Sequence, residues 1–283
     1  MGVGHDENFP VASLLCPPEL RAPIRALYRY ARTADDLADE GPLAPAERRL
    51  ALEHYRAAMH AAAGGQVDPR WPAVFGPLAE AIAAHCLPVG ALDDLLDAFV
   101  QDCDNAGYAT RADLLDYCRR SANPIGRLLL HLRGIDDPRA LAESDAICSA
   151  LQLINFWQDP SIDLARGRCC FPREDLCRHG LRPEALAAAG DTAATQAMVR
   201  ELSAWAARLM AEGVPLVWRV HGRMGWELRL VVQGGLRILE RIAAMQYRTL
   251  SQRPALRPWD GPVMLWRAAR MRPGRGAAGL RPA

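Results

Sequence analysis

Residues 35–40, Asp-Asp-Leu-Ala-Asp-Glu, and residues 155–163, Asn-Phe-Trp-Gln-Asp-Pro-Ser-Ile-Asp, lie in stretches whose apolar spacing predicts α-helix. Because an α-helix turns once every ~3.6 residues, side chains three or four positions apart share a face. The acidic residues of each segment recur at this spacing, where like charges repel by roughly 0.2–0.5 kcal/mol per pair. We therefore expect a cation to bind at each segment.

The aligned carboxylates are Asp35, Asp36 and Asp39 in the first segment, and Asp159 and Asp163 in the second. Mg²⁺ prefers oxygen ligands, commonly takes one or two carboxylates, and completes its shell with water and substrate phosphate. We predict a Mg²⁺ site with Asp35, Asp39, Asp159 and Asp163 as ligands, which holds a diphosphate. The alternative is that each segment is a solvated helix face, or that the first merely ends a helix.

The composition limits the classes of protein to which the chain could belong. Half of its 283 residues are apolar, enough for a large core, and 33 acidic residues nearly balance 34 basic ones, so nucleic-acid binding is not indicated. The eight scattered cysteines are typical of reduced thiols, and the N-terminus lacks the features of a signal peptide. We expect a cytoplasmic protein; transient membrane contact could involve the arginines near the C-terminus, Arg267, Arg270, Arg272 and Arg275.

Leu, Ala and Arg dominate the chain, β-branched residues are few, and Pro and Gly separate long stretches of helical periodicity. The sequence therefore predicts an all-α fold, with one domain over residues 1–271 and a disordered tail over 272–283. The predicted helices cover residues 18–39, 45–63, 71–86, 91–105, 111–133, 138–162, 173–179, 183–189, 192–212, 227–250 and 262–270. No glycine-rich nucleotide-binding fingerprint is present, so we expect no nucleotide cofactor.

Polar residues beside the acidic segments are further candidates for the site. Arg32 could form an ion pair within its own helix, or its planar guanidinium could bind the diphosphate, which we favour. Gln152, Asn155 and Asp159 form one polar stripe on an otherwise apolar helix. The two amides could bond neighbouring helices, but we expect them to face a polar pocket. From periodicity alone, Tyr117 would be a core residue.

With these motifs assembled, the chain resembles the squalene/phytoene synthase family over nearly its full length. The resemblance rests on Tyr-Arg-Tyr-Ala-Arg-Thr-Ala-Asp-Asp-Leu-Ala-Asp-Glu at 28–40, Leu-Gln-Leu-Ile-Asn-Phe-Trp-Gln-Asp with a later Asp at 151–163, and Gln-Gly-Gly-Leu-Arg-Ile-Leu at 233–239. It implies a single-domain isoprenoid synthase fold, with a central apolar cavity and two aspartate-rich helices facing each other at its mouth.

The resemblance also implies roles for individual residues. Both aspartate groups fall on the family's catalytic motifs, and Tyr117 falls on a position that lines the site. The residues matching substrate-binding positions are Phe9, Tyr28, Arg32, Gln152, Asn155 and Gln158. Many relatives carry Arg where this chain has Gln158, which removes one diphosphate partner. Cys170 and Gly235 stand where some relatives have larger side chains, and we expect the smaller groups to leave room for water.

Within the family, the resemblance is strongest to bacterial enzymes that convert presqualene diphosphate to hydroxysqualene on the route to hopanoids. We therefore predict an enzyme that ionises an isoprenoid diphosphate and captures the rearranged cation with water. One alternative is a relative that makes presqualene diphosphate, phytoene or dehydrosqualene. Another is a non-catalytic scaffold protein, although a scaffold would not need the repelling carboxylates.

Overall fold

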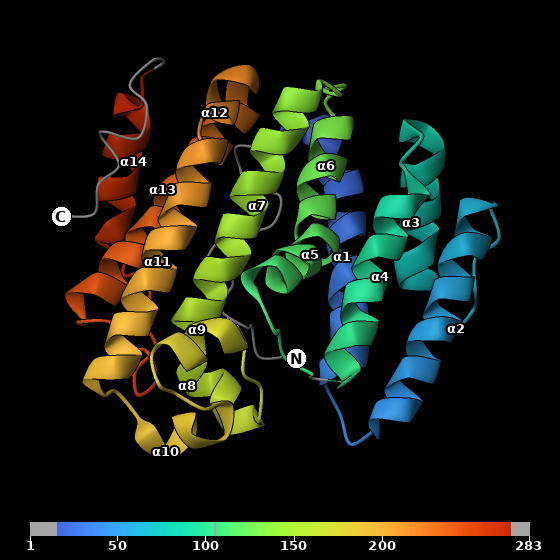
Figure 1. Ribbon diagram of the computed structural model, residues 1–283. Helices are drawn as coiled ribbons and strands as arrows, with labels where there is room; N and C mark the ends of the chain where they lie inside the picture. Colours follow the sequence, from blue (N-terminus) through green and yellow to red (C-terminus); the bar gives the residue numbers. More distant parts are fainter. Residues whose placement is uncertain (1–15, 105, 273–283) are drawn as a thin grey trace. The chain divides into compact units, whose positions relative to one another are not determined.

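The computed structural model describes residues 16–104 and 106–272 (Figure 1). All the regular elements in these ranges are helical, which confirms the all-α prediction. The contacts divide the chain into two compact units. The N-terminal unit contains described residues 16–104, 106 and 117–141, and the C-terminal unit contains 107–116 and 142–272. The predicted extent of one domain over 1–271 stays a prediction, and the predicted disordered tail lies outside the described residues except for Arg272.

The N-terminal unit is built mainly from five helices. They are α1 (Arg21–Asp39), α2 (Pro45–Ala63), α3 (Pro72–His85), α4 (Val89–Asp104) and α6 (Asn123–His131). A 3₁₀ turn, Pro18–Leu20, precedes α1, and the helix α5 (Arg111–Ser121) begins in residues of the C-terminal unit. Within this unit α1 packs against α2, α3 and α4.

Helix α1 positions the first acidic segment because its two faces differ. Ala26, Tyr30, Ala34 and Ala38 follow one another at four-residue intervals and are all buried in the unit's core. Residues at that spacing form one stripe, so the acidic residues between them are carried on the outward side. The apolar stripe therefore determines where the carboxylates lie.

Aromatic rings fix α1 against its neighbours. Tyr30 and Tyr55 are fully buried and stacked, with ring centroids 5.4 Å apart. The hydroxyl of Tyr30 donates to the Leu92 carbonyl over 3.0 Å, and that of Tyr55 donates to the Tyr30 carbonyl over 3.0 Å. A buried hydroxyl without a partner would cost about 1–3 kcal/mol. These bonds therefore avoid that cost for both tyrosines and fix the positions of their rings.

Helix α3 contains a proline, and α1 compensates for it. Pro77 has no N–H to donate to the carbonyl of Ala73, one turn earlier. Nη1 of Arg29 donates to that carbonyl over 2.8 Å instead. The side chain of Arg29 on α1 thus supplies a hydrogen bond in place of the one that the proline removes from α3.

The C-terminal unit contains the remaining helices. They are α7 (Pro138–Gln158, from residue 142 on), α8 (Pro160–Asp163), α9 (Arg173–Arg178), α10 (Leu186–Ala189), α11 (Ala193–Gly213), α12 (Leu216–Arg219), α13 (Gly222–Ala244) and α14 (Asp260–Arg270). Two 3₁₀ turns, Leu164–Arg166 and Pro183–Ala185, lie among the short helices. Figure 1 shows α8, α9 and α10 at one end of the long helices of this unit and α12 at the other.

Glycines allow the long helices of the C-terminal unit to approach closely. A Cβ at Gly213 of α11 would lie 2.5 Å from Cγ1 of Ile147 on α7. A Cβ at Gly235 of α13 would lie 2.9 Å from Cδ2 of Leu151 and 3.0 Å from Cε of Met210. The space beside Gly235 is therefore already filled, and the expectation that it leaves room for water is wrong.

The predicted helices at 111–133 and 138–162 are each interrupted. The first divides into α5 and α6, with Pro124 within the first turn of α6. The second divides into α7 and α8, because Pro160 has no N–H to donate to the carbonyl of Phe156. The short helix α12 was not predicted, since four residues are too few to show periodicity.

Two further observations bear on the predicted cellular setting. In the described part of the chain, no helix combines the length and hydropathy that a membrane span requires. The eight cysteines all carry free thiols.

Candidate active site

The first aspartate cluster consists of Asp35, Asp36 and Asp39 on α1. The side chains of Asp35 and Asp36 are 39% and 41% exposed, and Nη1 of Arg32 lies 2.9 Å from Oδ2 of Asp35. Nη2 of Arg32 lies 2.6 Å from Oδ1 of Asp36, but that oxygen is buried and has no well-aligned hydrogen bond. The cluster therefore retains oxygen atoms that could still bind a cation.

Arg32 is the centre of an ion-pair group within α1. Besides the two aspartates, Glu40 accepts from its Nη2 over 3.1 Å. Burial by itself would lower the pKa of Arg32, but the negative charges of Asp35, Asp36 and Glu40 raise it. The structure thus displays the intrahelical pairing that the sequence offered as the alternative role of Arg32. Its direct contact with a diphosphate stays a prediction.

The second aspartate cluster consists of Asp159 and Asp163, at the junction of α7 and α8. Asp159 is the residue before α8, and its N–H still donates to the carbonyl of Asn155 over 3.0 Å. The N–H of Asp163 donates to the carbonyl of Asp159 over 2.9 Å. These bonds preserve the one-turn spacing of the two carboxylates, although Pro160 interrupts the predicted continuous helix.

The two carboxylates of this cluster have different surroundings. Asp159 is paired with Arg253, whose Nε donates to Oδ1 over 2.5 Å. Burial raises the pKa of Asp163 to about 6, and the nearby charge of Asp159 adds to the shift, against the opposing effect of Arg168. The thiol of Cys170 lies 3.8 Å from Oδ2 of Asp163. A cation at this cluster would relieve the cost of the buried carboxylate.

The polar stripe on α7 is accessible, as expected of residues that face a pocket. Gln152 is half-buried and Asn155 is exposed. Within residues 16–104 and 106–272 neither side-chain amide has a hydrogen-bond partner. The two amides therefore do not fasten α7 to a neighbouring helix here, and their binding of substrate stays a prediction.

Gln158 lies deeper than the stripe. Its side chain is fully buried, and its Nε2 donates to the carbonyl of Pro254 over 2.7 Å. This bond fastens the end of α7 to the segment before α14. The bond gives Gln158 a structural role, and its contact with substrate stays a prediction.

Two of the remaining predicted residues, Tyr117 and Tyr28, belong to the N-terminal unit. Tyr117 is buried, and its hydroxyl donates to Oδ2 of Asp102 over 2.8 Å. Tyr28 is 38% exposed on α1. Phe9 lies outside the described residues. The catalytic role of Tyr117 and the substrate-binding roles of Tyr28 and Phe9 stay predictions.

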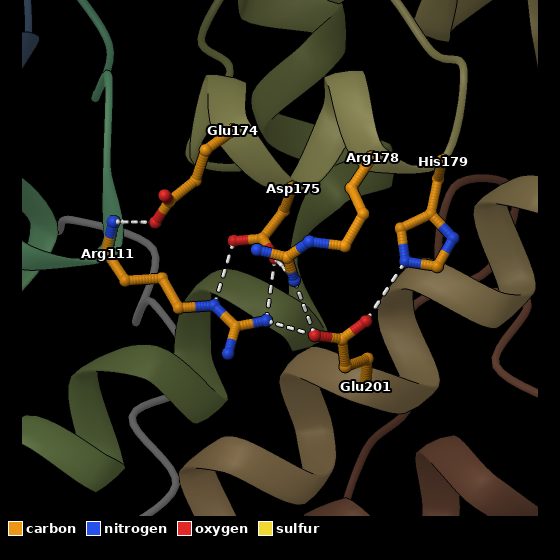
Figure 2. A network of polar contacts seen from close by, with 6 residues as sticks. All are labelled: Arg111, Glu174, Asp175, Arg178, His179 and Glu201. Carbon is orange, nitrogen blue, oxygen red and sulfur yellow. Dashed lines mark hydrogen bonds and ion pairs between the residues drawn. The ribbon is translucent and has the colours of Figure 1, made fainter.

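A polar network around the buried Asp175 supports the segment that follows the second aspartate cluster (Figure 2). Asp175 of α9 is fully buried and accepts from Nε and Nη2 of Arg111, over 3.0 and 2.6 Å. Glu201 of α11 accepts from Arg111 over 2.6 Å and from Arg178 over 2.7 Å. His179 contacts the same carboxylate at 3.2 Å. The network joins the start of α5 to α9 and α11.

Sequence reasoning missed two partners of the predicted site residues. Arg253 pairs with Asp159 across 94 residues of chain, and Asp102 pairs with Tyr117 from a different helix. Neither pair shows a spacing that a single sequence could reveal.

The donor chemistry of both clusters fits a hard divalent cation, because carboxylate oxygens are the ligands that Mg²⁺ prefers. Asp36 has a buried oxygen with no aligned hydrogen bond, and Asp163 is a buried carboxylate with a raised pKa. Within the described ranges, no group of three or more His, Cys, Asp or Glu side chains is placed to bind one ion. Cys169, Cys170, Cys177 and His179, which lie close together in the sequence, likewise do not form such a group.

Comparisons with known proteins show the family to which the chain belongs. The family model for squalene/phytoene synthase matches residues 3–260. The chain is 35% identical over 241 residues to a hydroxysqualene synthase of Sinorhizobium fredii, covering 85% of this chain and 79% of that protein. It is 32% identical over 255 residues to a hydroxysqualene synthase of Rhodopseudomonas palustris, covering 89% and 84%.

Among solved structures, squalene synthase HpnC from Alicyclobacillus acidocaldarius is similar, with a TM-score of 0.79 and 35% identity over 86% of this chain and 90% of that one. A dehydrosqualene synthase in complex with a ligand shares the fold, with a TM-score of 0.73 and 19% identity over 88% and 85% of the two chains. The predicted isoprenoid synthase fold is thereby confirmed, and the chain belongs to the squalene/phytoene synthase family.

Proposed function

We propose that this protein converts presqualene diphosphate to hydroxysqualene. The observation that carries the proposal is its similarity to proteins named hydroxysqualene synthase, at 35% and 32% identity over most of both chains. The surroundings of Gln158 support it. That residue is neutral, fully buried and bonded to a backbone carbonyl, so it offers no positive charge to a second diphosphate.

The reaction begins with heterolysis of the bond between carbon and the diphosphate oxygen, and the leaving group takes the electron pair. Arg32 lies beside the first aspartate cluster and Arg253 beside the second, and both can hold diphosphate oxygens through bidentate hydrogen bonds. The cyclopropylcarbinyl cation rearranges, and water adds to it through oxygen. The added water then loses one proton to solvent or to the released diphosphate, so no reductant is required.

Asp35, Asp39, Asp159 and Asp163 would hold Mg²⁺, as the sequence predicts. The bound ion would supply positive charge that neutralises the departing diphosphate. The accessible amides of Gln152 and Asn155 would orient polar groups of the substrate, and the apolar side chains that line the predicted central cavity would exclude stray water. Tyr117, fixed by Asp102, would form part of that lining.

The principal alternative is a different reaction within the same family. A phytoene synthase of Thermus thermophilus is 29% identical over 265 residues, covering 93% of this chain and 88% of that protein. A synthase that makes presqualene diphosphate, phytoene or dehydrosqualene would use the same clusters. We favour hydroxysqualene because the relatives of that name are more similar over comparable lengths.

Product analysis distinguishes these activities. Purified protein is incubated with Mg²⁺ and either farnesyl diphosphate, geranylgeranyl diphosphate or presqualene diphosphate. We expect hydroxysqualene from presqualene diphosphate alone. Turnover of farnesyl diphosphate, or a C40 product from geranylgeranyl diphosphate, would refute the proposal.

Variants of the clusters test whether the protein is a non-catalytic scaffold. Asp35→Ala and Asp159→Ala should abolish turnover while leaving the helical circular dichroism spectrum unchanged. Unchanged turnover in both variants would refute the role of the clusters. We also propose that the enzyme acts in the cytoplasm on the route to hopanoids, with transient contact to the membrane that holds its lipid-like substrate and product.

A further inference from the structure

A cavity of about 300 Å³ lies where α12 meets the start of α13. Its walls are largely apolar, and its lining includes Val217, Trp218, Val220, Trp226 and Arg229. Cavities of this size, apolar with a few polar groups, are typical of small-molecule sites. In the C-terminal unit this corner lies at the opposite end of the long helices from α8, which adjoins Asp159 (Figure 1). The cavity is therefore separate from the second aspartate cluster.

Arg229 is the cation of this cavity, and its contacts are unusual. Its guanidinium lies over the ring of Trp218, 4.1 Å from the centroid, and 5.1 Å from the centroid of Trp226. Its Nε is buried without a hydrogen-bond partner, and no carboxylate within residues 16–104 and 106–272 pairs with it. Other half-buried arginines of this unit, such as Arg111 and Arg241, have acidic partners.

The cost of partly burying Arg229 is not fully compensated within the described residues, because Arg229 has no acidic partner there. Stacking on two indoles compensates part of the cost of removing a guanidinium from water. A buried donor without a hydrogen-bond partner nevertheless destabilises the folded protein. Burial lowers the pKa of Arg229, as expected of a cation without a nearby negative charge.

The start of α13 provides further donors at the same place. His221 precedes the helix without capping it through its side chain, and His221, Gly222 and Gly225 all line the cavity. The first N–H groups of a 23-residue helix carry partial positive charge and favour anions. Gly225 is required by the close approach of Val220, the residue after α12, because a Cβ there would lie 2.0 Å from the carbonyl oxygen of Val220.

We propose that this cavity binds an anionic amphiphile, with a phosphate or carboxylate head on Arg229 and the first turn of α13. The hydrocarbon part lies against the apolar walls and Trp226, which is 41% exposed at the rim. A small inorganic anion would satisfy the guanidinium but leave the apolar walls hydrated, whereas a neutral lipid would leave Arg229 unpaired. An amphiphile satisfies both parts of the cavity.

Calorimetric titration with hexyl phosphate, inorganic phosphate and hexanol tests the proposal. Titrations are made in EDTA, so that metal-dependent binding elsewhere does not contribute. We expect hexyl phosphate to bind at least about tenfold more tightly than phosphate, and hexanol not to bind measurably. Arg229→Gln should weaken hexyl phosphate binding about tenfold or more, because it removes the charge.

Arg270→Gln is the matched control. Arg270 also stacks on an indole, 4.3 Å from the ring centroid of Trp266, but it does not line the cavity. Its loss should leave hexyl phosphate binding unchanged. If Arg229→Gln does not fold, Trp226→Ser removes the exposed wall and should weaken hexyl phosphate without affecting phosphate. Equal binding by wild type and the cavity variants, or equal affinity for phosphate and hexyl phosphate, would overturn the proposal.

Sedimentation with vesicles distinguishes two sources of the amphiphile. Co-sedimentation with phosphatidylglycerol vesicles that Arg229→Gln abolishes would assign the site to a membrane lipid, provided that Arg257→Gln, which alters an indole-stacked arginine outside the cavity, retains it. Binding of hexyl phosphate that depends on Arg229, without such co-sedimentation, would assign it to a free amphiphile. Absence of any Arg229-dependent binding in both experiments would refute the site.

Discussion

Arg253 donates to Asp159 over 2.5 Å and thereby places a positive charge on one of the two carboxylates of the second aspartate cluster. Both side chains are partly exposed, 31% for Arg253 and 25% for Asp159. The pair is therefore open to exchange with a ligand. In the proposed reaction Arg253 would release Asp159 and donate to the diphosphate, and Asp159 would then be free to hold a metal ion.

Removal of Arg253 should increase the affinity for Mg²⁺. Arg253→Gln eliminates a positive charge that competes with the metal for Asp159, so we expect the half-saturating Mg²⁺ concentration to fall about threefold or more. We also expect the KM for presqualene diphosphate to rise, because a diphosphate partner is lost. Steady-state kinetics over a range of Mg²⁺ concentrations measures both changes.

Arg257→Gln is the control for this experiment. Arg257 belongs to the same segment before α14, but its guanidinium lies over the ring of Trp259, 5.2 Å from the centroid. Its loss should alter neither parameter. A higher Mg²⁺ requirement in Arg253→Gln would instead show that Arg253 holds Asp159 in the conformation that binds metal.

Asp163→Asn should stabilise the metal-free protein at pH 7 while abolishing turnover. Burial raises the pKa of Asp163 to about 6, so its ionised form destabilises the folded state. This cost is absent below the unfolded pKa of about 4, grows as the pH rises toward 6, and is complete above it. Urea unfolding in EDTA should show a gain of about 1–2 kcal/mol at pH 7.

The corresponding variant of Asp159 provides the comparison. Asp159→Asn removes a carboxylate that is paired with Arg253, so no gain in stability is expected. If Asp163→Asn is not more stable than the wild type between pH 6 and 8, the carboxylate is not destabilising in the metal-free fold.

Local sequence patterns predicted most of the fold. Helix α2 begins and ends at Pro45 and Ala63 as predicted, since Pro suits the first turn and Gly64 follows the last. The two interrupted helices were predicted as continuous because the apolar periodicity continues across Ala122 and Asp159. Pro124 and Pro160 remove only backbone hydrogen bonds. Periodicity shows which residues share a helix face, but it does not show where a single backbone hydrogen bond is lost.

The candidate site was predicted only as far as local spacing reaches. The ion pairs of Arg32 lie within one helix, so the sequence could propose them. The burial of Gln158 and the close packing at Gly235 depend on segments far along the chain, Pro254 and Met210 among them. Their roles could not be predicted from spacing, because tertiary packing determines which face of a helix is covered.

Asp175→Asn should destabilise the protein by about 1.5–3 kcal/mol, because it removes the buried carboxylate that accepts two hydrogen bonds from Arg111 and leaves Arg111 with Glu201 as its counter-ion. Figure 2 shows Asp175 between the guanidinium groups of Arg111 and Arg178. Chemical denaturation measures the change in the free energy of unfolding. We expect turnover to fall as well, since α9 follows the second aspartate cluster in the same unit.

The neighbouring residue tests whether burial is the cause. Glu174 accepts from the backbone N–H of Arg111 over 2.7 Å but is exposed. Glu174→Gln should therefore cost less than about 1 kcal/mol. Equal destabilisation by the two variants would mean that the network of Figure 2 does not derive its strength from the buried carboxylate.

Asp260→Asn should reduce the dependence of stability on pH in acid. Burial alone would raise the pKa of Asp260, but hydrogen bonds from the N–H of Arg257 and from Arg241 and Arg237 outweigh it and lower the pKa to about 2. A carboxyl group whose pKa is lowered on folding stabilises the protein above its unfolded pKa of about 4. That stabilisation is lost as the pH falls from about 4 toward 2.

Urea unfolding of wild type and Asp260→Asn between pH 2 and 7 measures this contribution, which we expect to be about 2 kcal/mol at neutral pH. The difference between the two proteins should shrink as the pH falls from about 4 toward 2, because Asp260 becomes protonated first in the unfolded protein and then in the folded one. Glu240→Gln serves as the control, since Glu240 pairs with Arg237 and Arg267 but is 21% exposed. A difference between wild type and Asp260→Asn that stays constant down to pH 2 would show that packing at the junction of α13 and α14, and not the charge of Asp260, accounts for the loss.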